Sequence, residues 1–170
     1  MSRERAEQTC MEMLYQRGYT DISKEGDEYF LALKPDGNQV ALIFYNLAKF
    51  DTKGMKETIS LMNEIEVHHI IVVYKEDVTP ATKTLLSHSE DREFELFAEE
   101  DLQYNITKHR LQPKFERIPE CDAEQFIKKY GLKFSTLRVD RPISRFYNYK
   151  RGDVIRITRS CGYINYRIVR

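Results

Sequence analysis

Hydrophobic and polar positions along the chain alternate with two periods, and these periods predict which segments are helices and which are strands. In residues 3–17 apolar side chains recur three or four positions apart, at Ala6, Cys10, Met13 and Leu14. This spacing is typical of an amphipathic helix, and Gly18 stands where such a helix ends. The first element is therefore predicted to be a helix with one buried face.

Two strands joined by a tight turn are predicted next. A polar turn is expected at Ser23–Asp27, followed by strands at Glu28–Leu33 and Val40–Tyr45. Pro35-Asp-Gly-Asn38 predicts a turn between the strands, because proline presets φ and glycine or asparagine accepts a positive φ. The two strands should therefore form a β-hairpin.

Helix and strand patterns alternate from residue 54 to residue 97. Helices are predicted over residues 54–66 and from Thr79-Pro80 onward, and strands over His69–Tyr74 and Glu93–Phe97. This order implies parallel strands that are joined by right-handed crossovers. We therefore predict that residues 1–104 form a small α/β sandwich of nuclease-like topology.

The remainder of the chain, residues 105–170, is predicted to be a second, smaller α+β module. Residues 111–115 should be extended, because the proline within them disfavours a helix. Asp122 and Gln125 resemble a capping box, which predicts a helix that ends at Gly131.

Beyond Pro142 the pattern alternates with period two and predicts a second β-hairpin around the short turn Ser160-Cys-Gly162. On the first strand, one predicted face carries Ile155 and Ile157, and the other carries Val154, Arg156 and Thr158. On the second strand, one predicted face carries Ile164, Tyr166 and Ile168, and the other carries Asn165 and Arg167. We expect one face of this hairpin to be buried and the other to bear the arginines.

Charge divides the chain, although the whole is neutral with 27 basic and 27 acidic side chains. Residues 1–108 hold 12 basic and 21 acidic side chains, a net charge of −9, whereas residues 109–170 hold 15 and 6, a net charge of +9. Such a division favours two modules with different partners. Attraction between the two halves of the chain is the alternative explanation.

Composition excludes several classes of protein. The longest uninterrupted apolar run, Val40–Tyr45, is six residues long and too short for a transmembrane helix. The charged N-terminus lacks the apolar segment of a secretory signal. Three cysteines without a CxxC motif favour a reduced, intracellular protein. The sequence has no GxGxxG, GxxxxGK(S/T) or GxSxG motif, and no cofactor is expected.

Metal and nuclease chemistry find little support in the sequence. His68 and His69 are adjacent, so their side chains point to opposite faces of a strand and cannot chelate one ion together. A metal-dependent nuclease needs two acidic groups and a lysine; Asp36 could supply one carboxylate, but the strand after it supplies neither partner. Glu93 and Glu95 alternate on a strand without a neighbouring lysine. We therefore predict no catalytic residue and no metal site.

The start of the helix after residue 79 is a candidate contact with phosphate. Thr79 is a favourable N-cap, and Pro80 is favourable as the first helical residue. Free N–H groups and the positive end of the helix dipole can hold an anion at such a terminus. The candidate phosphate-contacting residues are Thr79, Pro80, Ala81, Thr82 and Lys83. From these residues alone, a cap that satisfies only its own helix is the favoured interpretation.

Motifs in the second half of the chain are specific enough to indicate a family. They are Asn105-Ile-Thr-Lys-His109-Arg-Leu-Gln-Pro113-Lys114, Asp140-Arg-Pro142-Ile-Ser-Arg145-Phe-Tyr147-Asn-Tyr-Lys150-Arg151-Gly152, and Arg159-Ser-Cys-Gly162-Tyr163-Ile-Asn-Tyr166-Arg167. With Glu12-Met13-Leu14, Arg17-Gly18-Tyr19 and Thr79-Pro80, they resemble the fifth subunit shared by the three eukaryotic nuclear RNA polymerases, whose C-terminal module is a separate small polymerase subunit in archaea. The last hairpin turn is shorter than in that family, and Phe115 replaces a histidine. These departures favour a divergent member, from a large DNA virus or a protist.

The resemblance implies a non-catalytic subunit of a multisubunit DNA-directed RNA polymerase. The N-terminal module would form part of the lower jaw near downstream DNA, with the segment from Thr79 to Lys83 as its DNA-proximal residues. The C-terminal module would anchor on the largest subunit. The implied subunit-interface residues are His109, Pro113, Lys114, Arg145, Tyr147, Lys150, Arg151, Gly152, Tyr166 and Arg167. Expected partners are the largest and other polymerase subunits and downstream DNA, with no membrane.

The expected location is the nucleus of a cell, or the host nucleus or cytoplasm and the virion of a virus. Two alternatives from other classes are a metal-dependent nuclease and a free nucleic-acid-binding module built on the basic second half.

Overall fold

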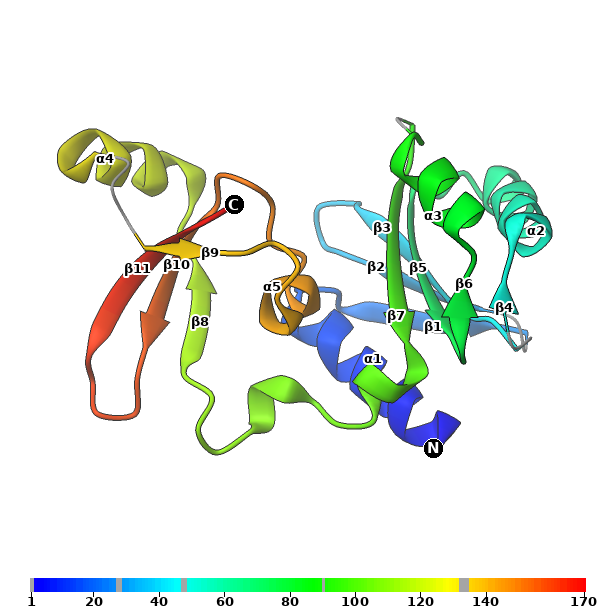
Figure 1. Ribbon diagram of the computed structural model, residues 1–170, viewed down its shortest axis with the longest axis horizontal. Coiled ribbons are helices and arrows are strands. Elements are labelled where there is room, and N and C mark those ends of the chain that lie inside the picture. The colour runs from blue at the N-terminus through cyan, green and yellow to red at the C-terminus, as the bar shows by residue number, and fades with distance from the viewer. Residues whose placement is uncertain (1, 27–28, 47–48, 90, 132–134) are drawn as a thin grey trace. The chain divides into compact units, whose positions relative to one another are not determined.

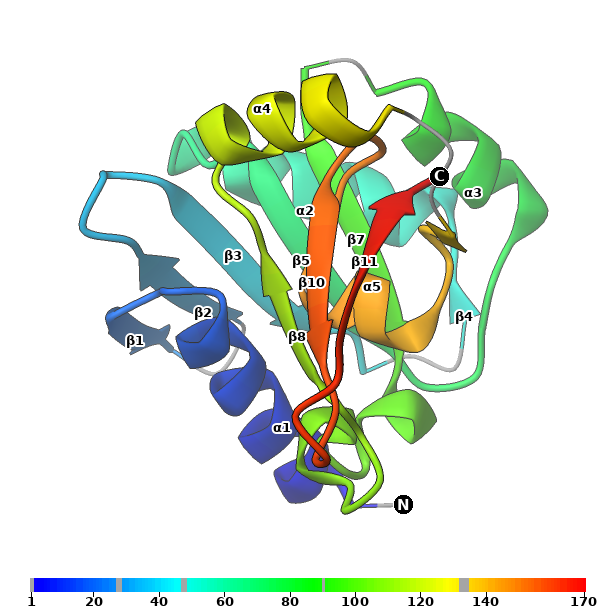
Figure 2. The ribbon, with the colours of Figure 1, turned by 90° about the vertical axis from the view of Figure 1, so that its left-hand side faces the viewer.

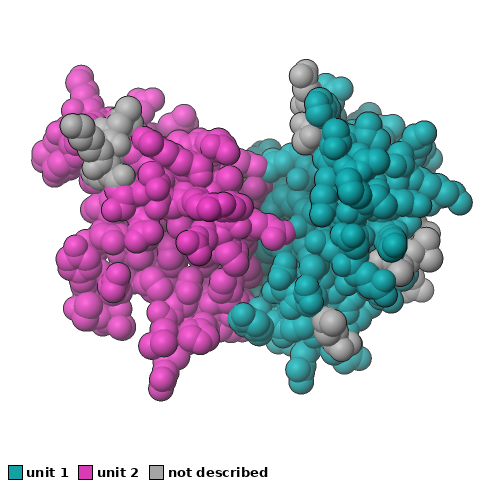
Figure 3. Space-filling model, in the orientation of Figure 1, with its two compact units in different colours: residues 1–104 teal, residues 105–170 magenta. Residues whose placement is uncertain are grey.

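The computed structural model describes residues 2–26, 29–46, 49–89, 91–131 and 135–170. The chain separates into two compact units, Met1–Tyr104 and Asn105–Arg170, which Figure 3 draws in different colours. Each unit has its own sheet and its own hydrophobic core (Figure 1). The chain is therefore of mixed α and β structure, and each unit is described by itself.

A five-stranded mixed sheet forms the centre of the N-terminal unit. Its strands, in spatial order, are β1 (Asp21–Glu25), β2 (Tyr29–Leu33), β3 (Gln39–Phe44), β5 (His69–Tyr74) and β7 (Glu93–Ala98). The first three are antiparallel neighbours, whereas β3, β5 and β7 run parallel, as predicted. The predicted turn between β2 and β3 is confirmed, with Gly37 at a φ of +88°. A second, two-stranded sheet pairs β4 (Lys49–Phe50) with β6 (Asp77–Val78).

Helices cover both faces of the five-stranded sheet. Helices α2 (Thr52–Glu64) and α3 (Pro80–Ser87) pack on the face that carries Ile43, Ile70 and Val72. Helix α1 (Arg3–Gln16) covers the opposite face, and its predicted apolar stripe is buried. Figure 1 shows α2 and α3 on one side of the sheet and α1 on the other. The 3-10 turn η1 (Glu99–Leu102) follows β7 and packs beside α1.

The C-terminal unit is built on a four-stranded sheet of order β8–β10–β11–β9. Its elements are η2 (Ile106–Lys108), β8 (Lys114–Arg117), α4 (Glu120–Tyr130), β9 (Thr136–Leu137), α5 (Pro142–Phe146), β10 (Val154–Thr158) and β11 (Ile164–Val169). The predicted hairpin of β10 and β11 is confirmed. One face of the sheet packs against α5 through residues that include Ile143, Ile155 and Ile157. Helix α4 lies over the other face (Figure 2). There the ring centroids of Phe126 and Tyr166 are 4.5 Å apart.

The predicted polar turn at Ser23–Asp27 is wrong. Ser23, Lys24 and Glu25 belong to β1, which pairs with β2 at the edge of the sheet. An edge strand tolerates charged side chains because much of it faces solvent, so the polar composition did not prevent pairing. Asp27 and Glu28, the predicted end of the turn and start of the next strand, lie outside the described residues.

Three local predictions for the C-terminal unit are also wrong. Helix α4 begins directly after Pro119, so Asp122 lies within its first turn and makes no capping box. Leu111 lies in a turn and not in a strand, because the Gln112 N–H donates to the His109 carbonyl at 2.9 Å. The alternating pattern begins only at Val154, because Pro142 starts the short helix α5.

The strand register places an arginine on each face of the second hairpin, so the prediction of one arginine-bearing face is wrong. Ile155 pairs with Arg167, and Arg156 pairs with Tyr166. Residues directly opposite one another in an antiparallel pair share a face. Arg167 therefore lies on the core face with Ile155, while Arg156 lies on the face that α4 partly covers.

Candidate functional site

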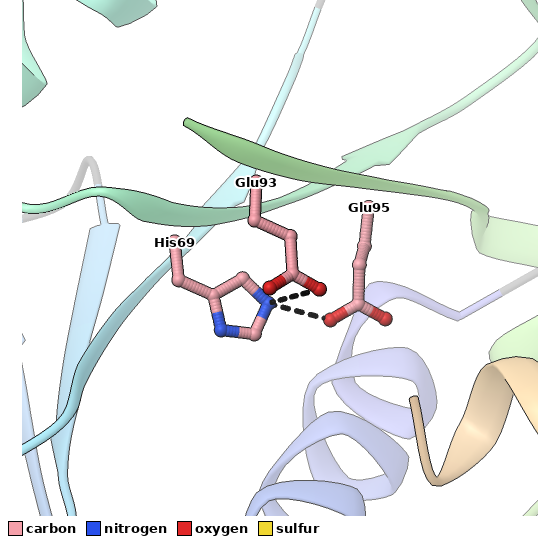
Figure 4. A group of neighbouring side chains, drawn as sticks. All are labelled: His69, Glu93 and Glu95. Carbon is pink, nitrogen blue, oxygen red and sulfur yellow. Dashed lines mark hydrogen bonds and ion pairs between the residues drawn. The ribbon is translucent and has the colours of Figure 1, made fainter. Parts of the chain in front are cut away.

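A buried charged cluster joins α1 to the sheet of the N-terminal unit. His69 on β5 lies opposite Glu93 on β7, and Glu95 lies two residues further along the same face. The His69 Nε2 atom is 2.7 Å from a Glu95 carboxylate oxygen and 3.9 Å from a Glu93 carboxylate oxygen (Figure 4). Arg17, which follows α1, donates one hydrogen bond to each carboxylate oxygen of Glu95, both at 2.7 Å.

Glu95 is held in its ionised form by these partners. Its side chain is 10% exposed and that of Arg17 is 4% exposed. Burial alone would raise the pKa of Glu95, but the hydrogen bond from His69 and the guanidinium of Arg17 outweigh this and lower the pKa from 4.5 to about 2. The Tyr19 hydroxyl lies 3.4 Å from the other ring nitrogen of His69, and burial raises the pKa of Tyr19 to about 12.

The geometry of this cluster satisfies one requirement of a metal site and opposes another. One ligand atom each from His69, Glu93 and Glu95 lies within 4.8 Å of the others. However, both oxygens of Glu95 already accept hydrogen bonds from Arg17, whose positive charge repels a cation at short range. The residues therefore fit a charge-compensated structural link better than a metal centre. Sequence reasoning missed this link, because only the strand register and the end of α1 bring the four side chains together.

A groove of about 680 Å³ opens beside the cluster and is bordered by His69 and Glu93. Among the described residues that line it there is neither a lysine nor Asp36. Asp36 lies in the turn between β2 and β3, where it accepts a hydrogen bond from the Asn38 N–H at 3.0 Å. The described lining does include the acidic residues Glu66, Asp91 and Glu93, but it lacks the lysine that such a nuclease combines with its carboxylates.

The candidate DNA-proximal segment forms the start of α3, as predicted. Thr79 is the N-cap; its hydroxyl accepts from the Thr82 N–H at 3.4 Å and lies 2.7 Å from the Thr82 hydroxyl. Thr82 is buried, whereas Pro80, Ala81 and Lys83 are exposed. The Lys83 ammonium is 3.9 Å from the Asp77 carboxylate. The threonines therefore serve the helix itself, and the exposed residues of this segment are the ones that a partner can reach.

Several predicted interface residues lie along β8 and β11. Lys114 is exposed and its ammonium is 2.7 Å from Glu116, while Tyr166 is half-buried under Phe126. Arg167 donates to the Thr136 carbonyl at 3.5 Å, but its Nε atom is buried without a hydrogen-bond partner among the described residues. Arg167 is half-buried and lies on the core face of the sheet with Ile155.

The two predicted interface residues nearest the start of the unit lie before β8. His109 is exposed, and its Nδ1 atom accepts a hydrogen bond from the Leu111 N–H at 3.2 Å. Pro113 is half-buried just before the strand. Both therefore belong to the turn that leads into the sheet.

Of the remaining predicted interface residues, Arg145 lies in α5, and Tyr147, Lys150, Arg151 and Gly152 lie between α5 and β10. The rings of Tyr147 and Tyr149 stack with centroids 5.3 Å apart, and burial raises the pKa of Tyr147. The backbone N–H of Lys150 donates to Asp153 at 2.8 Å, and Gly152 adopts a φ of +96°, which glycine accepts without strain. Arg151 is exposed and Arg145 is half-buried. This segment is therefore an ordered turn that presents basic side chains.

Comparison with known proteins identifies the C-terminal unit. Residues 104–169 match the family described as RNA polymerase Rpb5, C-terminal domain. This span coincides with the C-terminal unit, Asn105–Arg170. The unit is thus of the class of RNA polymerase subunit domains.

Relatives extend the similarity to the N-terminal unit. A protein of Dictyostelium discoideum, named as subunit rpabc1 of DNA-directed RNA polymerases I, II and III, is 28% identical over 86% of this chain and 80% of the relative. The Caenorhabditis elegans protein named RPABC1 is 30% identical over 78% of this chain and 66% of the relative. The chain belongs to the Rpb5 (RPABC1) family.

A viral protein and a solved structure complete the comparison. One relative is a protein of Invertebrate iridescent virus 6, named as DNA-directed RNA polymerase subunit 454R. It is 42% identical over 45% of this chain and 48% of its own length. The apo structure of EndoMS aligns with 58% of this chain and 48% of that chain, at a TM-score of 0.35 and 18% identity. No function follows from a structural likeness at that level. Within the described residues, none of the helices has the length and apolar character that crossing a bilayer requires.

Proposed function

We propose that this chain is a non-catalytic subunit of a multisubunit DNA-directed RNA polymerase, with its N-terminal unit in the lower jaw near downstream DNA and its C-terminal unit anchored on the largest subunit. The family match over residues 104–169 is the observation that carries this proposal. The two cellular relatives, which are named as polymerase subunits, align over 86% and 78% of this chain, so both units have counterparts in them.

The charge of the C-terminal unit supports its role as the anchor. Residues 109–170 carry 15 basic and 6 acidic side chains. The Val139 N–H donates to the Arg170 carbonyl, and the Gly152 N–H donates to the Val169 carbonyl. These two hydrogen bonds bring the basic ends of β9, β10 and β11 together. We propose that Arg145 and Arg151 pair with carboxylates of the largest subunit, because arginine is a frequent anchor in interface cores.

Charge reversal tests this anchor. The double variant with Arg145→Glu and Arg151→Glu should lose the largest subunit on co-purification, since loss of such an anchor weakens binding by about 2 kcal/mol or more. The same changes at Lys128 and Lys129, which are exposed on α4, form the matched control and should leave assembly unchanged. Circular dichroism of both variants checks that the fold persists. Unchanged recovery of the largest subunit by the arginine variant contradicts the proposed anchor.

The proposed DNA contact is local and depends on the rest of the enzyme. An exposed helix terminus favours an anion by only about 0.3–1 kcal/mol. Repulsion from a segment of net charge −9 over residues 1–108, including Glu76 and Asp77 beside α3, opposes even that gain. The free chain should therefore bind duplex DNA weakly at physiological salt, whereas inside the polymerase the duplex is already held nearby.

Co-purification of the tagged chain from its source tests the proposed function directly. The large polymerase subunits should be recovered with it, and their absence would overturn the proposal. Incubation of the purified chain with DNA and Mg²⁺ tests the nuclease alternative. Cleavage that disappears in Asp36→Ala would favour a nuclease over a polymerase subunit.

A further inference from the structure

One end of the C-terminal unit exposes three large apolar side chains. Leu111 is 76% exposed, Tyr163 is 61% exposed and Ile164 is 46% exposed. Leu111 lies in the turn before β8, while Tyr163 and Ile164 lie where the β10–β11 hairpin turns back. Large apolar groups that gather on a surface commonly mark a contact with a partner.

The strand register places these segments at the same end of the sheet. Strand β10 lies between β8 and β11, and its last residue, Thr158, is opposite both Lys114 and Ile164. Figures 1 and 2 both show the turn before β8 and the tip of the β10–β11 hairpin at the end of the unit away from α4. We call residues 108–114 and 158–164 the hairpin-end surface.

The hairpin-end surface is uniformly basic. It contains Lys108, Arg110, Lys114 and Arg159 and no aspartate or glutamate. All four basic residues are exposed. Glu116, the next acidic residue along the chain, forms an ion pair with Lys114 at 2.7 Å. The surface therefore combines apolar contact area with positive charge.

We propose that the hairpin-end surface binds an acidic protein segment that also carries large apolar side chains. Complementary charge favours an acidic partner, and the three exposed apolar groups require apolar counterparts. A nucleic acid is disfavoured, because bases stack on aromatic rings and two of the three apolar groups here are aliphatic. The inference rests on the proposed function for the identity of the partner, which is a neighbouring polymerase subunit. This surface includes His109, Pro113 and Lys114 of the interface residues that the resemblance implies, and it lies at the opposite end of β10 from Arg151.

Photocrosslinking from position 161 tests the inference. Cys161 is exposed in the hairpin turn, within this surface. A photoreactive amino acid placed there in the tagged full-length chain should crosslink, within the complex purified from the source, to a peptide rich in acidic and apolar residues. The double variant with Arg110→Glu and Arg159→Glu should reduce this crosslink about tenfold or more. Replacing both Leu111 and Ile164 by serine should do the same.

The matched control reverses the same number of basic charges at a different place on the unit. Lys128→Glu with Lys129→Glu reverses two exposed charges on α4, at the other end of the unit, and should leave the crosslink unchanged (Figure 2). Crosslinks only to nucleic acid, only to a second copy of this chain, or equal in the wild type and in the Arg110 and Arg159 variant would overturn the inference.

Recovery of the large polymerase subunits, measured in the same samples, separates the two proposals. If these subunits are recovered without an acidic crosslinked segment, the inference fails and the proposed function stands. If an acidic segment is crosslinked and no polymerase subunit is recovered, the proposed function fails and the assignment of the surface stands.

Discussion

Substitution of Glu95 by glutamine should destabilise the N-terminal unit in a pH-dependent way. The change keeps the size of the side chain but removes the charge that Arg17 and His69 contact at 2.7 Å. A carboxyl whose pKa falls from 4.5 to about 2 on folding contributes roughly 3 kcal/mol to stability when it is ionised. Removing one partner of a buried ion pair also costs roughly 3–5 kcal/mol, because the other charge stays buried. We therefore expect a loss of about 3 kcal/mol near pH 7.

The sign of the pH dependence follows from the direction of the pKa shift. Because the pKa of Glu95 is lower in the folded state, its contribution is complete above about pH 4.5 and is lost as the pH falls toward 2. The difference in the free energy of unfolding between wild type and Glu95→Gln should therefore be largest at neutral pH. It should shrink between pH 4.5 and pH 2.

Urea denaturation at pH 7, 5, 3 and 2 measures this difference, and hydrogen exchange of α1 assigns it to the N-terminal unit. Glu93→Gln is the matched control, because Glu93 lies on the same strand face but is 39% exposed and 3.9 Å from His69. The control should have a much smaller effect. A stability difference for Glu95→Gln that is constant from pH 7 to pH 2 would refute the account of the cluster.

Three further predictions concern packing and the DNA contact. Gly54→Ala should destabilise the chain by about 1–3 kcal/mol in urea denaturation, because the added methyl would lie less than 3 Å from ring atoms of Tyr45. Adding Tyr45→Leu to this variant should restore most of the lost stability. Equal stability of Gly54→Ala and wild type would contradict this prediction. Phe126→Ala should raise hydrogen exchange throughout α4, because that ring packs on the sheet and no residue of the helix is buried; unchanged protection would show that other contacts hold α4. A photoreactive group at position 80 should label downstream DNA in the assembled polymerase, and changing Thr79 and Pro80 together should alter transcription without affecting assembly. Labelling of protein alone would show that the segment is only a helix cap.

Local patterns were sufficient for most of the elements. The apolar stripe of α1, the β-branched run of β5 and the Thr79-Pro80 start of α3 each reflect a short-range preference that tertiary contacts reinforce. One error falls where a long-range contact outweighs such a preference: strand β1 is polar, yet it forms because β2 offers a free edge. Another error is local, since α4 begins directly after Pro119 although Asp122 resembles a cap.

The candidate site was less predictable than the fold. The motifs around residues 105–114 and 140–152 indicate the family, because the order of residue types is itself informative. They do not show that Thr82 and the Arg167 Nε atom are buried or that Lys114 pairs with Glu116. Exposure depends on which neighbours cover a side chain, and those neighbours are distant in sequence.

The sequence by itself determined the helical and strand periods, the division of charge between residues 1–108 and 109–170, and the family resemblance. Each of these depends on residue types and short spacings, which are present before the chain folds. Only the tertiary structure decided that Arg17 and His69 meet Glu95, and that Arg167 shares the core face with Ile155. The physical reason is strand register: a shift by one residue turns every side chain to the other face, and no local pattern specifies which residues of two distant strands pair.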